Sequence, residues 1–218
     1  MDTISFTGQR PGLFDLPPVP VVALTGEEFG TDTTKEALTR AADAKLRELQ
    51  QCEGLKNDDT GWELRINRNS RKKIGDNQDQ STAELQAVAA IELLARHAVV
   101  AEKHPDFEHY NEFVLAIYRL YAPLEINGEM HRVKLTVKDY IGPDAKKALH
   151  ALAAVEIENA PLGTLPTSVS EETLQSGQPT TGRTLSIADL LAGATLNNGE
   201  PYTFRPESDM SAALDVAK

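Results

Sequence analysis

The stretch EINGEMHRVKLTVKDY, residues 125–140, decides the fold prediction because it joins a turn to an alternating strand. Asn127-Gly128 is the strongest short-range signal for a β-hairpin turn in the chain. In a two-residue loop Ile126 faces Glu129, and the register of both strands follows from that pair. Beyond the turn, polar residues alternate with apolar ones: Arg132, Val133, Lys134, Leu135, Thr136, Val137 and Lys138.

This register divides the hairpin into two faces. The apolar face should pack on a core and contains Tyr118, Leu120, Ala122, Val133, Leu135 and Val137. The polar face contains Arg119, Tyr121, Arg132, Lys134 and Thr136, with Lys138 at its far end. Arginine and lysine bind phosphate oxygens and would stabilise the charge that develops when a phosphodiester is cleaved. The alternative is a solvated sheet face, since Lys, Arg and Thr are soluble and tolerate strands.

The net charge of −11 opposes non-specific binding to nucleic acids or anionic membranes, so a nucleic-acid site must be a local basic patch. Cys52 is the only cysteine, which excludes an intrachain disulfide and a multi-cysteine metal site; we expect it to pack as a small core residue. No apolar run is long enough to span a membrane, and the N-terminus lacks the features of a signal peptide. We therefore expect a soluble, cytoplasmic protein.

Signals outside the hairpin predict an α+β fold in which N-terminal helices pack on an antiparallel β-sheet. Capping-box spacing starts one helix at Thr33 and another at Ser81. The first helix should present an apolar stripe of Leu38, Ala41, Ala42, Leu46 and Leu49. Gly142-Pro143 should end the hairpin and begin a short helix, and the basic, then polar, stretch 68–80 reads as a connection. The remaining strands are expected at 21–24, 60–67, 98–104 and 154–159.

The chain divides into three parts by composition. Residues 1–20 form a proline-rich extended arm, and residues 21–159 form the α+β domain. Residues 160–218 are a linker and C-terminal tail with a short amphipathic helix near 186–192, for which Ser186 is the expected cap and Gly193 the expected stop.

Several segments together resemble a known family. They are NDDTGWELRINRNSRKKI (57–74), HAVVAEKHPD (97–106), YRLYAPLEINGEMHRVKLTVKDY (118–140) and VEIE (155–158), and the tail SGQPTTGRTLSIADLLAGATLNNG (176–199) is similar to tails of related prophage proteins. In this order they resemble the large polyvalent protein-associated domain of the third type. That domain occurs in multi-domain proteins delivered with phage or conjugative DNA into a bacterial host.

The resemblance implies a fold similar to that of the barnase, EndoU, colicin and RelE group of metal-independent RNases. It implies no cofactor and no metal. His104 would act as base or acid within about two hydrogen bonds of Arg132. Asp59 and Trp62 are expected to be structural, in a turn and in the core. The candidate catalytic residues are His104, Arg132, Lys134, Thr136 and Tyr121, and the candidate nucleic-acid contacts are Arg119, Lys72 and Lys138.

Three functions remain open at this stage. The first is a metal-independent ribonuclease or RNA-binding domain that uses the polar face of the hairpin. The second is a non-catalytic module that binds a host or phage protein, favoured by the acidic charge, the proline-rich arm and the tail helix. The third is a component of a capsid or injection machine. The two extended arms would also allow an oligomer, and no membrane partner is expected.

Overall fold

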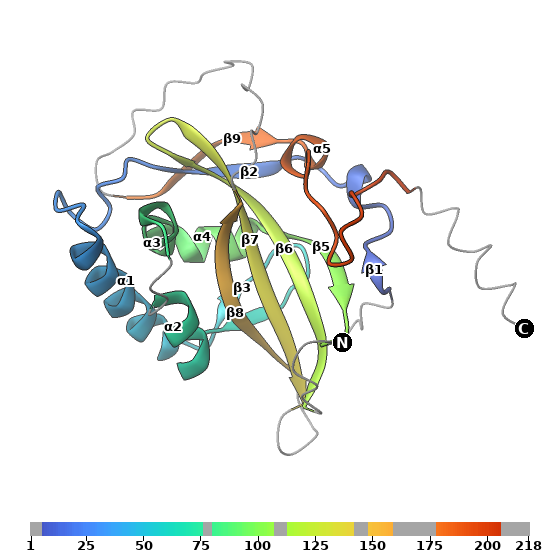
Figure 1. The fold of residues 1–218 in the computed structure, drawn as a ribbon, viewed down its shortest axis with the longest axis horizontal. Coiled ribbons are helices and arrows are strands. Elements are labelled where there is room, and N and C mark those ends of the chain that lie inside the picture. Colours follow the sequence, from blue (N-terminus) through green and yellow to red (C-terminus); the bar gives the residue numbers. More distant parts are fainter. Residues whose placement is uncertain (1–5, 76–79, 107–112, 142–147, 159–177, 206–218) are drawn as a thin grey trace, which may run out of the picture.

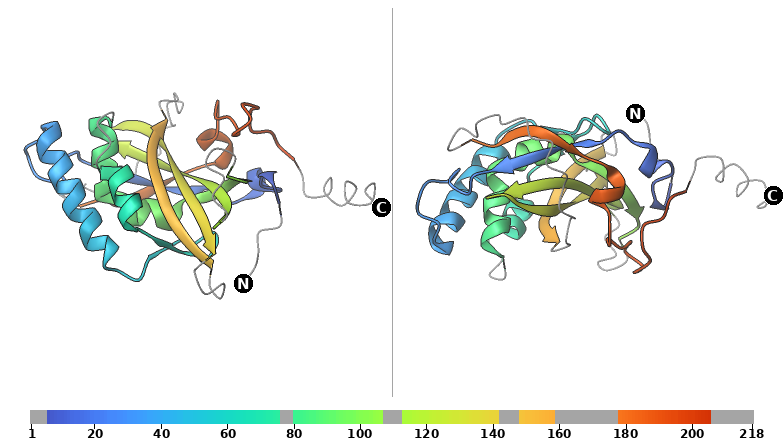
Figure 2. Two further views of the ribbon diagram at one scale, coloured as in Figure 1. Left: turned by 60° about the horizontal axis from the view of Figure 1, so that its bottom comes forward. Right: turned by 90° about the horizontal axis from the view of Figure 1, so that it is seen from above.

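The structure is a computed structural model that describes residues 6–75, 80–106, 113–141, 148–158 and 178–205. It confirms the α+β class: helices cover one face of a twisted sheet, and an extended segment crosses the other face (Figure 1, Figure 2). The helices are α1 (Lys35–Gln50), α2 (Arg68–Gly75), α3 (Thr82–Ala87), α4 (Ile91–His97) and α5 (Ile187–Leu190). The strands are β1 (Gly8–Gln9), β2 (Val19–Leu24), β3 (Leu55–Lys56), β4 (Glu63–Arg65), β5 (Val99–His104), β6 (Val114–Ile126), β7 (Glu129–Ile141), β8 (Ala148–Glu158) and β9 (Thr180–Leu185).

Strands β6 and β7 form the predicted hairpin. Ile126 pairs with Glu129, as expected for a two-residue loop. Asn127 has φ 52° and Gly128 has φ 82°, the left-handed values of a type I′ turn. The Asn127 amide also donates to the Leu24 carbonyl at 3.0 Å, which ties the turn to β2.

The sheet is mixed, whereas the sequence predicted an antiparallel one. Its main path is β1-β5-β6-β7-β8-β4-β3. β2 lies parallel to β6 and antiparallel to β9, and β4 lies parallel to β8. Both parallel pairs join strands that are far apart in the chain, so no local turn signal could reveal them.

The predicted apolar face of the hairpin packs against the helices and forms the inner core. All six residues expected on that face are buried there. Helix α1 contributes Leu38, Ala42, Leu46 and Leu49, the helical spacing of its predicted apolar stripe. Because one face of the long strands is buried this way, a shift of one residue in register would expose the core.

Three local predictions need correction. The N-cap of α1 is Thr34, whose side chain accepts from the Ala37 amide at 3.4 Å, and not Thr33. Residues 68–75 form helix α2 and not a connection, because the Asn67 side chain caps the Ser70 amide at 2.8 Å. Cys52 is exposed, since α1 ends at Gln50 and the chain turns away from the core. The capping box of Ser81 and Glu84 is confirmed.

The opposite face of the sheet forms a smaller outer core with two segments from the ends of the chain. One is the N-terminal arm, which buries Leu13. The other is residues 178–205, here called the strap, which includes β9 and α5. Ser186 caps α5, as its sequence suggested, and the strap buries Leu185, Ile187, Leu190, Leu191, Ala194 and Leu196. The short helix predicted at Pro143 lies outside the described residues.

The loop before β4 fastens the end of α4 to the sheet. Asn57 is fully buried, and its amide donates to the carbonyls of Ala95 and Ala98 at 2.7 Å each. The Asp59 carboxylate accepts from the Val100 amide at 2.9 Å and pairs with Arg10 of the N-terminal arm at 2.6 Å. Both residues have structural contacts. None of the described helices is long and apolar enough to cross a membrane.

We expect Asn57→Ala to lower the free energy of unfolding by about 2–4 kcal/mol, because two buried carbonyls lose their donor. Urea denaturation followed by circular dichroism measures this loss. Asn198→Ala is the matched control, since Asn198 is exposed on the strap and should change stability by less than about 0.5 kcal/mol. Equal effects of the two variants would contradict the fastening role of Asn57.

Candidate functional site

We call the polar face of the hairpin the outer face. Its upper half is the half nearer the Asn127-Gly128 turn, and its lower half is the end with Lys138 and Tyr140. The strap covers the upper half. Arg132 on β7 is only 3% exposed. Its Nη1 donates to the carbonyls of Leu190 and Ala192 at 3.1 and 2.9 Å, and its Nε pairs with Glu158 at 3.0 Å. The guanidinium therefore serves as a C-terminal cap for α5. A residue used in this way cannot also bind a phosphate.

The other cations of this upper half are neutralised by carboxylates. Lys134 lies 2.8 Å from Glu156 and 3.2 Å from Glu158. Burial lowers the pKa of Lys134, but these carboxylates outweigh it, so that the pKa is raised and the ammonium stays charged within the pair. Arg119 lies 3.6 Å from Glu102, which is itself 2% exposed and accepts from the Asn197 amide of the strap. The predicted basic patch is thus neutral and covered.

Tyr121 and Thr136 complete the upper half. Tyr121 is fully buried, and its ring contacts Arg132 and the ring of Tyr202 from the strap. Burial, followed by the charge of Glu158, raises the pKa of the Tyr121 phenol, which therefore stays protonated. Thr136 is partly exposed opposite Arg119. The expected catalytic set of Arg132, Lys134, Tyr121 and Thr136 shares one face, but the strap occupies that face.

His104 does not lie beside Arg132, which corrects the expected catalytic pair. The strand register aligns His104 with Ile117 of β6, whereas Arg132 aligns with Pro123 of the same strand. Six residues of strand separate the two positions by about 20 Å. His104 instead belongs to the lower half of the outer face, in the same row as Lys138, two strands or about 10 Å away.

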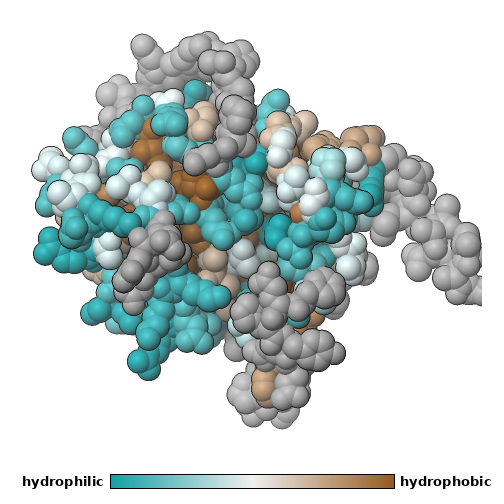
Figure 3. All heavy atoms as spheres, viewed as in Figure 1, coloured by the Kyte–Doolittle hydropathy of each residue, from teal (hydrophilic) through white to brown (hydrophobic). Residues whose placement is uncertain are grey.

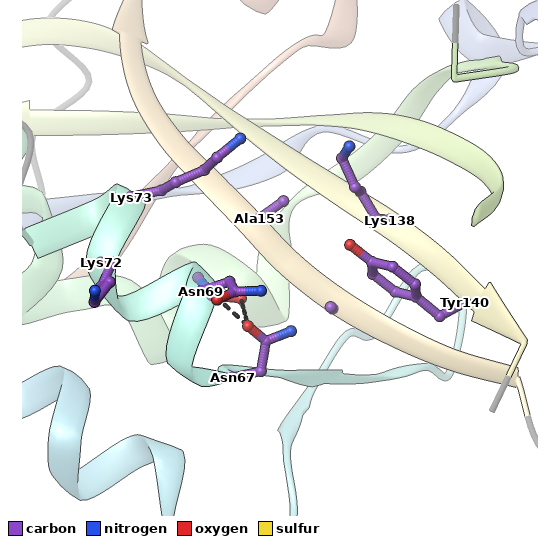
Figure 4. Close-up of a pocket in the computed structure, with 9 residues that line it drawn as sticks. Asn67, Asn69, Lys72, Lys73, Lys138, Tyr140 and Ala153 are labelled. Atoms are coloured by element: carbon purple, nitrogen blue, oxygen red, sulfur yellow. Dashed lines mark hydrogen bonds between the residues drawn. The ribbon is translucent and has the colours of Figure 1, made fainter. Parts of the chain in front are cut away.

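The lower half of the outer face contains a cavity of about 350 Å³ between α2 and strands β7 and β8 (Figure 4). We call it the cationic pocket; its lining residues are Asn67, Asn69, Ser70, Lys72, Lys73, Lys138, Tyr140, Ala151 and Ala153. The structure thus brings together two of the predicted nucleic-acid contacts, Lys72 and Lys138, with a third lysine. Lys138 pairs with Asp106 at 3.1 Å, whereas Lys72 and Lys73 are exposed and make no ion pair with any described residue.

Helix α2 supplies most of the positive charge of this region. Arg68, Arg71, Lys72 and Lys73 fall within its eight residues, and among the described residues only Arg71 has an ion-pair partner, Asp43 at 3.3 Å. Figure 3 shows that the surface over α1 and α2 is mostly hydrophilic. On a chain with net charge −11, α2 is a local basic patch of the kind that a nucleic-acid site requires. The sequence RNSRKK (68–73) indicates the positive charge, but it has no apolar stripe from which a helix could be predicted.

A second group of titratable residues lies on the inner face, at the lower end of β7 and β8. Asp139 and His150 are paired directly across these strands. The His150 ring stacks on Trp62, with centroids 4.0 Å apart and planes 14° apart, and Tyr118 contacts the same indole edge-on at 4.7 Å. Burial lowers the pKa of His150, an effect that Asp139 partly opposes, and burial raises the pKa of Asp139. Trp62 therefore packs against the inner core but stays partly exposed, whereas the sequence placed it within the core.

No group of three or more His, Cys, Asp or Glu side chains gathers as metal ligands within the described parts of the chain. The described histidines do not cluster. His97 ends α4, and His131 faces Leu124 near the turn, whereas His104 and His150 lie near the other end of the sheet on β5 and β8, three strands apart.

A family model described as "Large polyvalent protein-associated domain 3" matches residues 33–152. The match runs from the N-cap region of α1 into β8, so it includes α2, the whole hairpin and most of the cationic pocket. The N-terminal arm and the strap lie outside it. Neither a curated protein nor a solved structure gives a significant match to the chain.

We expect Arg132→Ala to release α5, since the last carbonyls of that helix and Glu158 lose a buried donor. The free energy of unfolding should fall by about 2–4 kcal/mol. Hydrogen exchange should rise first in the α5 amides, which mass spectrometry of the strap peptides would report. Lys134→Ala, which breaks the pairs with the partly exposed Glu156 and Glu158 but leaves the α5 carbonyls bonded, is the control and should cost less than about 1 kcal/mol. Unchanged exchange in the strap of Arg132→Ala would contradict the capping role.

The fluorescence of Trp62, the only tryptophan, should report the protonation of His150. Because burial lowers the pKa of His150 from its ordinary 6.5, the ring is neutral at pH 7 and becomes a quenching imidazolium only below that value. The unfolded chain takes up this proton first as the pH falls, so His150 also makes the fold less stable below about pH 6.5. A pH titration of emission in wild type and His150→Gln tests this. A transition that persists in His150→Gln would contradict the assignment.

Proposed function

Because the chain belongs to the large polyvalent protein-associated domain 3 family, we propose that it is an accessory domain of a phage or mobile-element polyvalent protein and binds single-stranded RNA through the cationic pocket. The observation that carries the proposal is the convergence of Lys73 and Lys138 on one cavity, beside the ring of Tyr140, in a strongly acidic chain (Figure 4). Proteins that bind single strands combine cations along the backbone with an aromatic surface for bases.

The charges of the two halves of the outer face favour this location. In the upper half Arg119, Arg132 and Lys134 are matched by Glu102, Glu156 and Glu158. In the lower half Asp106 matches Lys138, but Lys72, Lys73 and Arg68 make no ion pair with a described residue. Phosphate groups would supply the missing negative charge, and binding would release their counterions.

The proposal is restricted to binding. Cleavage was expected from His104 acting with Arg132 and Lys134. His104 lies about 20 Å from Arg132 and about 13 Å from Lys134 along the sheet, too far for either cation to act with it. The alternative of a protein-interaction module was favoured by the acidic charge, by the proline-rich arm and by a tail helix that would be free to dock elsewhere. In the structure both Leu13 of the arm and the helix, α5, pack on the sheet of their own chain, which leaves only the acidic charge in favour of this alternative.

We expect Lys72→Ala/Lys73→Ala to weaken binding of a labelled single-stranded RNA in fluorescence anisotropy. Each lost phosphate contact should also reduce the slope of log K against log salt by about 0.7, so that the double variant loses about 1.4. The salt slope separates a phosphate contact from a general change in fold.

The matched control is Lys35→Ala/Lys56→Ala, which removes the same charge from α1 and β3 and should leave both affinity and slope unchanged. Equal losses in the two double variants would mean that net charge alone governs binding. No binding by the wild type at low salt would overturn the proposal. A DNA strand of the same sequence shows whether the ribose contributes.

A further inference from the structure

We propose that the cationic pocket holds a single nucleotide, with its phosphate on Lys73 and on the ammonium donors that Lys138 does not give to Asp106, and with its base against Tyr140 and the Asn69 amide. This inference rests on the proposed function and deepens it, because RNA binding by charge alone would need no pocket. A volume of about 350 Å³ is at the small end of the range for small-molecule sites. The strand would continue over the exposed surface on either side.

Three kinds of side chain, ammonium, amide and phenol, line different sides of the cavity (Figure 4). The ammonium groups of Lys73 and Lys138 lie along one rim, and Asn67 and Asn69 lie on the opposite side. Tyr140 closes the third side, with its hydroxyl directed into the space. The small side chains of Ala151 and Ala153 leave the floor open. A site for inorganic phosphate would need only the first rim.

The amide groups on the second side are available to a ligand. Asn67 uses its Oδ1 to cap α2, accepting from the amide and hydroxyl of Ser70 at 2.8 and 3.1 Å, which leaves its Nδ2 as a donor. Asn69 is exposed and makes no hydrogen bond to any described residue. Side-chain amides both donate and accept, so they match the hydrogen-bonding edge of an unpaired base.

Tyr140 is placed to contact the base. It is partly buried on β7, two residues beyond Lys138 and therefore on the same face, and no ring of a described residue stacks on it. Lys73 and Lys138 extend from different elements, α2 and β7, so the pocket exists only when α2 is packed against β8. Lys72 points away from this rim in Figure 4 and would contact a neighbouring phosphate of the strand.

The test is competition by small ligands for the 218-residue chain, measured by calorimetry and by displacement of labelled RNA. The ligands are the four ribonucleoside 5′-monophosphates, ribose 5-phosphate and inorganic phosphate. We expect the best mononucleotide to bind at least about tenfold more tightly than ribose 5-phosphate or phosphate, in line with stacking energies for one base. Equal affinity for a mononucleotide and for phosphate would overturn the inference.

Variants assign the contacts. Tyr140→Leu and Asn69→Ala should reduce mononucleotide affinity toward that of ribose 5-phosphate and leave phosphate binding unchanged, whereas Tyr140→Phe should retain most of it. Lys73→Ala should weaken every ligand that carries a phosphate. Asn198→Ala on the strap is the control amide. Undiminished mononucleotide binding by Tyr140→Leu, with the fold confirmed by circular dichroism, would overturn the assignment of the base.

The two proposals can fail separately. If long RNA binds in a manner that depends on Lys72 and Lys73 but mononucleotides bind no better than phosphate, RNA binding stands and the single-nucleotide site is wrong. If a mononucleotide binds and long RNA does not, the pocket recognises a free nucleotide, and the RNA proposal is the one that falls.

Discussion

The rest of the structure depends on the pairing of β6 and β7, which the type I′ turn at Asn127-Gly128 holds in one register. That register sends Val133, Leu135 and Val137 to the inner core, where the four N-terminal helices cover them. It also places every arginine and lysine of β7 on the outer face. A slip of one residue would move every side chain of the strand to the opposite face. Burial of the apolar side chains in the inner core therefore favours the same register as the turn conformation does.

The outer face shows why a row of cations along a strand does not by itself make a binding surface. Arg132 is bonded to the C-terminal carbonyls of α5, and Lys134 is bonded to two glutamates of β8. Burying these charges is tolerable only because each has a partner. The result is a neutral, covered surface whose role is to hold the strap against the sheet, and the strap in turn excludes water from Tyr121.

The unbalanced positive charge lies elsewhere, on α2 and at the far end of β7. Helix α2 is short and has few apolar residues, so it depends on the Asn67 cap, on buried Ile74 and on packing against α1 and β8. This packing carries Lys73 across the edge of β8 toward Lys138, a residue 65 positions later in the chain. The family match includes both elements, whereas the strap that covers the upper half lies outside it.

Local patterns in the sequence were sufficient to predict the hairpin and its register, the apolar stripe of α1 and the caps at Ser81 and Ser186. Each of these features depends on residues that are close together in the chain. They also identified Lys72 and Lys138 as possible contacts, but not as neighbours. The tertiary structure decided the parallel pairs, the burial of Arg132 under α5, the separation of His104 from Arg132 and the pocket between α2 and β8. Each of these depends on contacts between segments distant in the chain, for which side-chain alternation carries no information about the partner.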